Sequence, residues 1–137
     1  MPISHRSLAH CIAAFGNSEP VPDWRCPSCG VVGNNRQSSS IVSCPTVLIL
    51  VLKRFNRVNG RTTKNNQTVF WDDVVSLNDS TYRLISSISH HNSILSGHYT
   101  ANVLFGGKWF KCNDLAVSPT NQVHNSSDVY LMAFERF

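Results

Sequence analysis

The strongest hydrophobic pattern lies in the middle of the chain, where residues 46–52 run almost without a polar interruption. A short, nearly continuous apolar run predicts a strand that is buried on both faces. We therefore expect a strand within residues 41–55, opened by Pro45 and placed at the centre of a sheet. Asn59-Gly60 then gives a strong turn signal, and a polar stretch follows to Asn66.

The N-terminal residues predict one short helix. Apolar side chains recur at spacings of three and four residues, which places them on one face of a helix over residues 7–15. Gly16-Asn17 follows and is typical of a helix end. The residues on the apolar face are Leu8, Cys11, Ile12 and Phe15.

The rest of the chain is dominated by strand patterns. Apolar segments separated by turn residues predict about five or six antiparallel strands, without the strand–helix alternation of a parallel sheet. Residues 90–96 are expected to form a flexible polar link, and residues 118–125 one helical turn. The fold class is therefore α+β, a single domain over residues 1–137. Besides the strand within 41–55, the predicted strands are 68–71, 82–89, 97–105, 108–112 and 129–134.

Composition indicates a folded chain without a membrane span. Hydrophobic residues make up 42% of the chain and charged residues 15%, which excludes a disordered protein. The longest apolar run, residues 47–52, is too short to cross a bilayer. The N-terminus lacks the apolar core of a signal peptide. We therefore expect a cytoplasmic or nuclear protein with no membrane partner.

The charge pattern does not favour nucleic-acid binding. The net charge is +4 and the pI is about 9.0. A nucleic-acid surface is usually denser in basic residues than this chain is, so we interpret its one loose basic group as a solvated loop. We expect no nucleic-acid partner; a zinc-knuckle module that binds DNA or RNA is the weaker alternative. The basic group consists of Lys53, Arg54, Arg57, Arg61 and Lys64.

The stretch from Cys26 to Cys29 has the form of a zinc knuckle, because a tight turn lets two thiolates face one metal ion. A structural zinc site needs about four ligands, and the chain contains neither a second CxxC nor an HxxxH pair. Cys26 and Cys29 are therefore expected to form only half of a structural zinc site. A redox pair, or a knuckle whose partner is missing, are the alternatives. The odd number of cysteines, five, argues against a disulfide framework.

A predicted hairpin brings together groups with catalytic chemistry. Its first strand begins at Gly97-His98, and its second returns to Asn113-Asp114. His98 should therefore lie beside Asn113 or Asp114. A histidine whose ring is held by a side-chain oxygen can act as general base toward a cysteine or serine nucleophile.

The phase of the second strand bears on the identity of the nucleophile. Side chains alternate between the two faces of a strand, so Cys112 faces away if Asn113 faces His98. We therefore do not expect Cys112 to be the nucleophile. Cys11 is assigned to the helix face and Cys44 to the start of a buried strand, so the chain shows no identifiable nucleophile.

Several motifs occur in a fixed order along the chain. They are the helix with Cys26 and Cys29 after it, the strand 45–55, the strand 82–91, the box 97–101, the segment 109–114 and the closing strand 130–134. Together they resemble the C-terminal half of the ubiquitin-specific protease family, the papain-like cysteine isopeptidases. Gly97-His98-Tyr99-Thr100-Ala101 matches that family's histidine box.

The resemblance implies the fingers and palm portion of the papain-like fold, a mainly antiparallel sheet with one short N-terminal helix. It also assigns roles to six residues. His98 is the general base, Asn113 orients it, Asp114 supports the cleft or shares that role, Tyr99 lines the channel for the ubiquitin tail, and Cys26 and Cys29 form half of the zinc ribbon in the fingers.

The departures from the family concern its N-terminal half. The thumb, the first zinc knuckle and the cysteine box have no counterpart in these 137 residues. One hypothesis is a deubiquitinase domain that hydrolyses ubiquitin C-terminal isopeptide bonds, here with the His/Asn half of the site and no nucleophilic cysteine. No cofactor is required for that catalysis. The alternative is a catalytically inactive fragment that binds ubiquitin or another partner.

Both hypotheses predict ubiquitin or ubiquitinated proteins as partners. A domain without its thumb would also expose the cleft wall and a sheet edge, and such surfaces favour association. We therefore expect poor solubility of the isolated chain.

Overall fold

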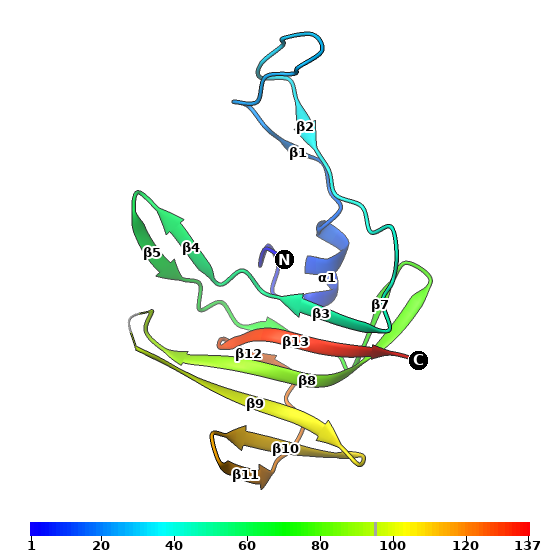
Figure 1. The fold of residues 1–137 in the computed structure, drawn as a ribbon, viewed down its shortest axis with the longest axis vertical. Coiled ribbons are helices and arrows are strands. Elements are labelled where there is room, and N and C mark those ends of the chain that lie inside the picture. The colour runs from blue at the N-terminus through cyan, green and yellow to red at the C-terminus, as the bar shows by residue number, and fades with distance from the viewer. Residues whose placement is uncertain (95) are drawn as a thin grey trace.

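The computed structural model describes residues 1–94 and 96–137, in which the dominant element is a seven-stranded antiparallel sheet (Figure 1). Its strands are β3 (Val47–Val51), β7 (Val74–Leu77), β8 (Ser80–Asn92), β9 (Gly97–Phe105), β10 (Lys108–Asn113), β11 (Ala116–Pro119) and β13 (Val129–Arg136). The order across the sheet is β11-β10-β9-β8-β13-β3, and β7 pairs with β8 as well. The last strand of the chain therefore lies between β8 and β3.

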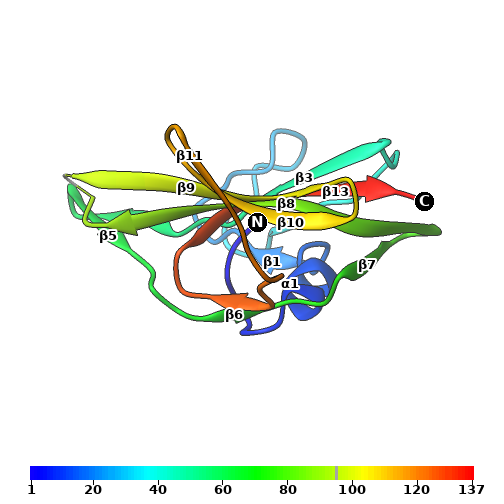
Figure 2. The same ribbon diagram turned by 90° about the horizontal axis from the view of Figure 1, so that it is seen from below.

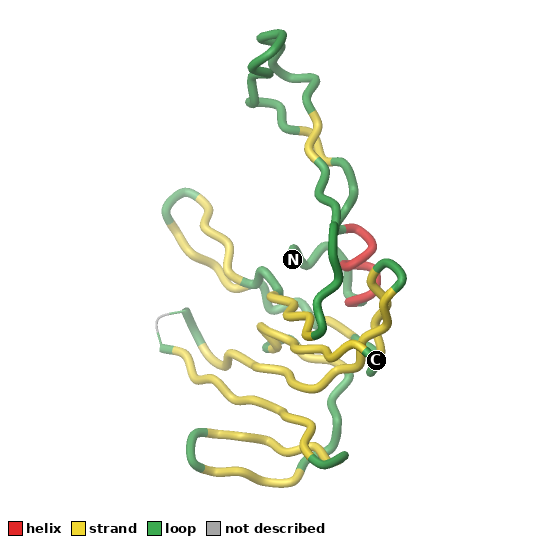
Figure 3. Tube along the Cα trace, turned by 45° about the vertical axis from the view of Figure 1, so that its right-hand side comes forward, coloured by secondary structure: helices red, strands yellow, loops and turns green. Residues whose placement is uncertain are grey.

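Three small two-stranded pieces surround this sheet. They pair β1 (Glu19–Pro20) with β2 (Arg36–Gln37), β4 (Phe55–Val58) with β5 (Arg61–Lys64), and β6 (Val69–Phe70) with β12 (Asn125–Ser126). Figure 3 shows the β1–β2 arm and the β4–β5 hairpin projecting from the body of the domain. The CxxC stretch lies in the loop of the β1–β2 arm.

The predicted helix is confirmed as α1 (Leu8–Ala14), with Leu8 and Cys11 buried. Figure 2 shows α1 and β6 on the same side of the large sheet. The core lies between them and the sheet, and its largest fully buried apolar members are Tyr82, Phe134, Leu8, Leu52, Leu84 and Met132. The expected α+β class, mainly antiparallel sheet with one short helix, is thus confirmed. No helix of the described residues is long and apolar enough to cross a membrane.

The prediction for the apolar run was wrong in its placement. β3 lies at an edge of the sheet and not at its centre. Its alternate residues Val47, Ile49 and Val51 are 47%, 58% and 37% exposed, so one face of the strand is bare. A continuous apolar run cannot distinguish a strand covered on both faces from an edge strand whose outer face is apolar and uncovered.

Two predicted connections also differ from the structure. Residues 90–92 of the expected flexible link belong to β8, which continues to Asn92 and pairs with β9. Leu95, within the same link, lies outside the described residues. The expected helical turn over residues 118–125 is replaced by the end of β11 and the start of β12. In both places the ladder to a neighbouring strand outweighs the local polar sequence.

The predicted solvated basic group was wrong for two of its five members. Arg54 is fully buried, and its guanidinium donates to four backbone oxygens. The side chain of Lys64 is only 7% exposed. Arg54 continues the period of two set by Leu48, Leu50 and Leu52, so it enters the interior where those side chains do.

The bare edge of β3 leads to a prediction about association. Ile49→Lys places a charge on an exposed apolar edge, where charged residues oppose pairing between chains. We expect the dissociation constant for self-association, measured by sedimentation velocity over a concentration series, to rise by about tenfold, or roughly 1.4 kcal/mol. Thr62→Lys, on the exposed face of β5, adds the same charge elsewhere and controls for net charge. An equal rise of the dissociation constant in the two variants would show that the chain does not associate through the β3 edge.

Candidate active site

The structure brings His98 and Asn113 into direct contact. The Nε2 atom of His98 lies 2.5 Å from Oδ1 of Asn113. The two residues stand on neighbouring strands, β9 and β10, whose register pairs Cys112 with Ala101 and Lys111 with Asn102. Asn113 therefore follows the same face of the sheet as His98, as the strand phase predicted.

A tight turn positions Asn113 at the end of β10. Asn113 pairs with Ala116 of β11, so only Asp114 and Leu115 connect the two strands. Asp114 has a φ of +51°, a left-handed conformation that Asp and Asn adopt more readily than most residues. The structure thus gives Asp114 a place in the turn, while the ring of His98 is held by Asn113. A supporting role of Asp114 in the cleft stays a prediction.

The contact with Asn113 sets the chemistry of the imidazole. The amide oxygen of Asn113 only accepts hydrogen bonds, so Nε2 of His98 carries the proton and donates it. In the neutral ring Nδ1 then has a free lone pair that can take a proton. The contact expected from the sequence is therefore present, and the role of His98 as general base stays a prediction.

The other candidates near the hairpin face the opposite side of the sheet. Cys112 pairs with Ala101 on the face away from His98, so the expectation that it does not serve His98 agrees with the register. Tyr99 is 52% exposed, and its ring lies tilted against that of His90, with the centroids 4.9 Å apart. Its predicted role in lining a channel for the ubiquitin tail stays a prediction.

His90 packs against the start of the strand that carries His98. It is 5% exposed, and its ring lies edge-on to Phe55 with centroids 5.2 Å apart. A Cβ atom on Gly97 would come within 1.9 Å of the His90 Nε2. Burial, together with the nearby charge of Lys64, lowers the pKa of His90, so the ring stays neutral. Gly97 is therefore required by the ring that fills the space beside it.

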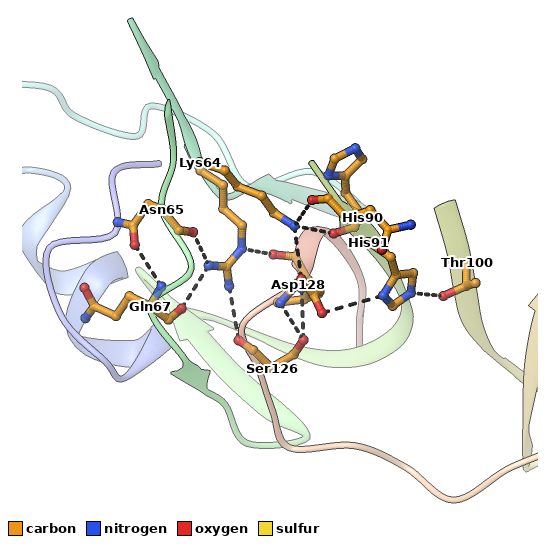
Figure 4. A network of polar contacts seen from close by, with 11 residues as sticks. Lys64, Asn65, Gln67, His90, His91, Thr100, Ser126 and Asp128 are labelled. Atoms are coloured by element: carbon orange, nitrogen blue, oxygen red, sulfur yellow. Dashed lines mark hydrogen bonds and ion pairs between the residues drawn. The ribbon is translucent and has the colours of Figure 1, made fainter. Parts of the chain in front are cut away.

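A network of polar contacts joins the β4–β5 hairpin to this end of the sheet (Figure 4). The ammonium of Lys64 donates to the main-chain oxygen of His90 at 2.6 Å and to Oδ1 of Asp128 at 3.0 Å. The other carboxylate oxygen of Asp128 lies 3.6 Å from Nδ1 of His91. Nε2 of His91 is in turn 2.8 Å from the hydroxyl of Thr100.

The CxxC turn supplies two thiols and no complete metal site. The backbone N–H groups of Cys29 and Ser28 bond to the thiolate of Cys26 and lower its pKa, as in a turn that favours metal binding. Gly30 closes the turn at a φ of +69°. Within the part of the chain that the structure describes, no three His, Cys, Asp or Glu side chains are placed to hold one metal ion. The expectation that Cys26 and Cys29 form half of a structural zinc site stays a prediction.

Comparison with known proteins identifies the family. The family model described as ubiquitin carboxyl-terminal hydrolase matches residues 21–134, most of the chain and the whole of the large sheet up to β13. The chain belongs to the ubiquitin carboxyl-terminal hydrolase family. The resemblance predicted from the ordered motifs is thereby confirmed.

Individual relatives agree with this assignment. Ubiquitin carboxyl-terminal hydrolase 8 of Saccharomyces cerevisiae is 28% identical over 139 residues, which cover 85% of this chain and 30% of that protein. Ubiquitin carboxyl-terminal hydrolase 8 of Arabidopsis thaliana is 31% identical over 148 residues, 95% of this chain and 17% of that protein. The chain thus spans about a third or less of the length of these two relatives.

Solved structures of the same family superpose on the fold. A chain in the structure of the yeast SAGA DUBm matches all of this chain and 34% of its own length, with a TM-score of 0.89 and 28% identity. A chain in the SAGA DUB module Ubp8/Sgf11/Sus1/Sgf73 bound to monoubiquitin matches with a TM-score of 0.81 and 28% identity over 99% of this chain and 34% of its own. The papain-like portion expected from the sequence therefore agrees with experimental structures of the family.

Sequence reasoning missed the residues that surround the His98–Asn113 pair. Lys64 was assigned to solvent because its basic neighbours suggested a loop. His90 and His91 were assigned to a flexible link because they are followed by polar residues. The pairing of β8 with β13 shifts register between Leu84 and Ser86, so the alternation that starts at Tyr82 does not continue to His90 and no local pattern gave its burial.

The close packing at Gly97 gives a stability prediction. Gly97→Ala forces a Cβ atom against the buried His90 ring, and overpacking of this kind costs about 1–3 kcal/mol. We expect the free energy of unfolding in urea to fall by that amount. In a His90→Ala background the same substitution should cost much less, because the ring is gone. Equal costs in the two backgrounds would contradict the proposed contact.

Proposed function

We propose that this chain carries the base half of a deubiquitinase active site, in which His98 is the general base and Asn113 orients it. The observation that supports the proposal best is the 2.5 Å contact between His98 Nε2 and Asn113 Oδ1. An imidazole held in one tautomer by an amide oxygen is suited to a cysteine nucleophile. A thiol is acidic enough to form an ion pair with imidazole without a buried carboxylate.

In this proposal Nδ1 of His98 takes the proton of a cysteine thiol, and the thiolate attacks the carbonyl of the isopeptide bond between ubiquitin and a lysine. The protonated His98 then gives its proton to the leaving lysine amine as the carbon–nitrogen bond breaks. A water molecule, deprotonated by the same nitrogen, hydrolyses the thioester and releases the ubiquitin carboxylate. Asn113 keeps Nε2 protonated through both steps.

The nucleophilic cysteine is proposed to come from sequence outside these 137 residues. The yeast relative is about three times as long as the matched part, since the chain covers 30% of it. The register directs Cys112 away from His98, and Cys26 and Cys29 lie on the β1–β2 arm. We also propose that those two thiols contribute half of a structural zinc site when the remaining ligands are supplied.

Ubiquitin is the proposed partner. The family model is named for hydrolysis at the ubiquitin carboxyl terminus, and one of the matching structures is described as bound to monoubiquitin. A protein that contains this chain is proposed to act in the cytoplasm or nucleus on ubiquitinated proteins, and neither nucleic acid nor a membrane is a proposed partner.

The second candidate function is a catalytically inactive fragment that binds ubiquitin or another protein. It is favoured by one observation: among the described residues, no cysteine is placed on the His98 face of the hairpin. Titration of the chain with labelled ubiquitin tests whether it binds ubiquitin at all, as both candidate functions require. Saturable binding without hydrolysis by the isolated chain is expected under both.

A chimera tests the catalytic proposal. We suggest replacing the matched 30% of the yeast ubiquitin carboxyl-terminal hydrolase 8 with this chain, so that the rest of that protein supplies the nucleophile. We expect the chimera to release a fluorophore from a ubiquitin C-terminal amide. His98→Ala should lower kcat by about 10²–10⁴-fold, the usual contribution of a general base. Asn113→Ala should lower kcat by about tenfold or more, because the tautomer is no longer fixed.

Asn34→Ala, an exposed asparagine on the β1–β2 arm, is the matched control and should leave kcat unchanged. A folded chimera that keeps full activity after His98→Ala would overturn the assignment of the base. Reaction of the isolated chain with an electrophilic ubiquitin probe, abolished by Cys112→Ala, would overturn the assignment of the nucleophile to other sequence.

A further inference from the structure

We propose that Lys64 is a positioning residue for the catalytic base: its ammonium, on a hairpin separate from the large sheet, holds the end of β8 and so fixes His98 against Asn113. The inference rests on the proposed role of His98 as the base. It assigns a function to a residue that has no contact with the base itself.

The side chain of Lys64 is unusual among the basic residues of this chain because its ammonium is enclosed by oxygen atoms. Its side chain is 7% exposed. Nζ lies 2.6 Å from the main-chain oxygen of His90, 3.5 Å from that of Asn92 and 3.0 Å from Oδ1 of Asp128. An ammonium has three donors, and each has one oxygen here. Removal of Lys64 would take this donor away from Oδ1 of Asp128 and from the main-chain oxygen of His90.

The two carbonyl groups belong to the residues that pair with the start of β9. Asn92 pairs with Gly97, and His91, between the two carbonyls, pairs with His98. Asn92 has a φ of +68°, a conformation that a residue other than glycine adopts at some cost. Lys64 therefore stabilises the strained end of the strand that lies directly opposite the base.

A second line of contacts reaches β9 through side chains (Figure 4). Asp128, held by Lys64 through one oxygen, faces Nδ1 of His91 with the other at 3.6 Å. His91 Nε2 contacts the Thr100 hydroxyl at 2.8 Å. Thr100 stands two residues after His98, so its side chain follows the same face of the strand. Lys64 thus acts on β9 both through the backbone of β8 and through Asp128.

Lys64 connects a separate hairpin to the large sheet. The β4–β5 hairpin pairs only with itself among the described strands, and is not part of the large sheet. Lys64 is the last residue of β5, where the hairpin returns to the domain. A displacement of the hairpin at this point would therefore act on the end of β8, which pairs with the strand that carries His98.

Nuclear magnetic resonance of the histidine rings tests the proposal on the 137-residue chain itself. In the ¹⁵N-labelled chain, long-range ¹H–¹⁵N spectra should show His98 in the Nε2–H tautomer. Lys64→Met keeps the length of the stem and removes the charge. We expect it to lower the His98 tautomer ratio by about fivefold, equivalent to roughly 1 kcal/mol. Lys64→Arg should restore part of the ratio, and Lys108→Met, an exposed lysine at the far end of the β9–β10 hairpin, should change nothing.

Thr100→Val provides a second variant that leaves Lys64 and the carbonyl contacts in place. It removes the hydroxyl next to His91 and keeps a side chain of similar shape, so we expect a smaller shift of the same ratio. If Lys64→Met proves too unstable to study, an unchanged ratio in Thr100→Val together with unchanged line widths of the His98 ring would overturn the proposal.

A third variant separates failure of this proposal from failure of the proposed base. Asn113→Ala should abolish the tautomer preference of His98. If Asn113→Ala does so and folded Lys64→Met does not shift the ratio, Lys64 is not a positioning residue while the base pair stands. If Asn113→Ala leaves the preference unchanged, the base assignment itself fails.

Discussion

The structure depends on the burial of one guanidinium among backbone carbonyl groups. Arg54 is fully buried, and its donors reach the main-chain oxygens of Val129, Asn65, Gln67 and Ser126 at 2.5–3.1 Å. Burial lowers the pKa of Arg54, and the nearby carboxylate of Asp128 opposes that shift. Each of these carbonyls would be costly to leave unpaired, so one side chain fixes two segments that are far apart in sequence.

Those two segments carry the residues that reach the site. The oxygens bonded by Arg54 at residues 65 and 67 follow Lys64, and those at 126 and 129 flank Asp128. Arg54 thus brings Lys64 and Asp128 to within 3.0 Å of each other. Its own hydrogen bonds reach neither His98 nor Asn113. The polar contacts extend from a buried cation, through an ion pair, to the end of β8. The end of β8, which pairs with the strand that carries His98, is therefore held by these hydrogen bonds as well as by its strand pairing.

The His98–Asn113 contact is local to one hairpin. His98 and Asn113 come from adjacent strands of one hairpin, so their contact needs no other part of a longer protein. The apolar face of β3, in contrast, has no cover among the described residues. The contact between His98 and Asn113 is formed within the hairpin, whereas the apolar face of β3 is exposed. The chain spans less than half of the length of the family members compared with it.

The sequence by itself determined the helix, the β9–β10 hairpin, the closing strand and the opposition of His98 to Asn113. These features depend on local periodicity and on strand phase, which neighbouring residues determine. Only the tertiary structure decided that β3 is an edge strand, that residues 90–92 extend β8, and that Arg54 and Lys64 are buried. Strand order and the burial of a charge depend on partners distant in the chain: β13 for β3, and backbone carbonyls for the two cations. No local pattern of hydrophobic and polar residues specifies such partners.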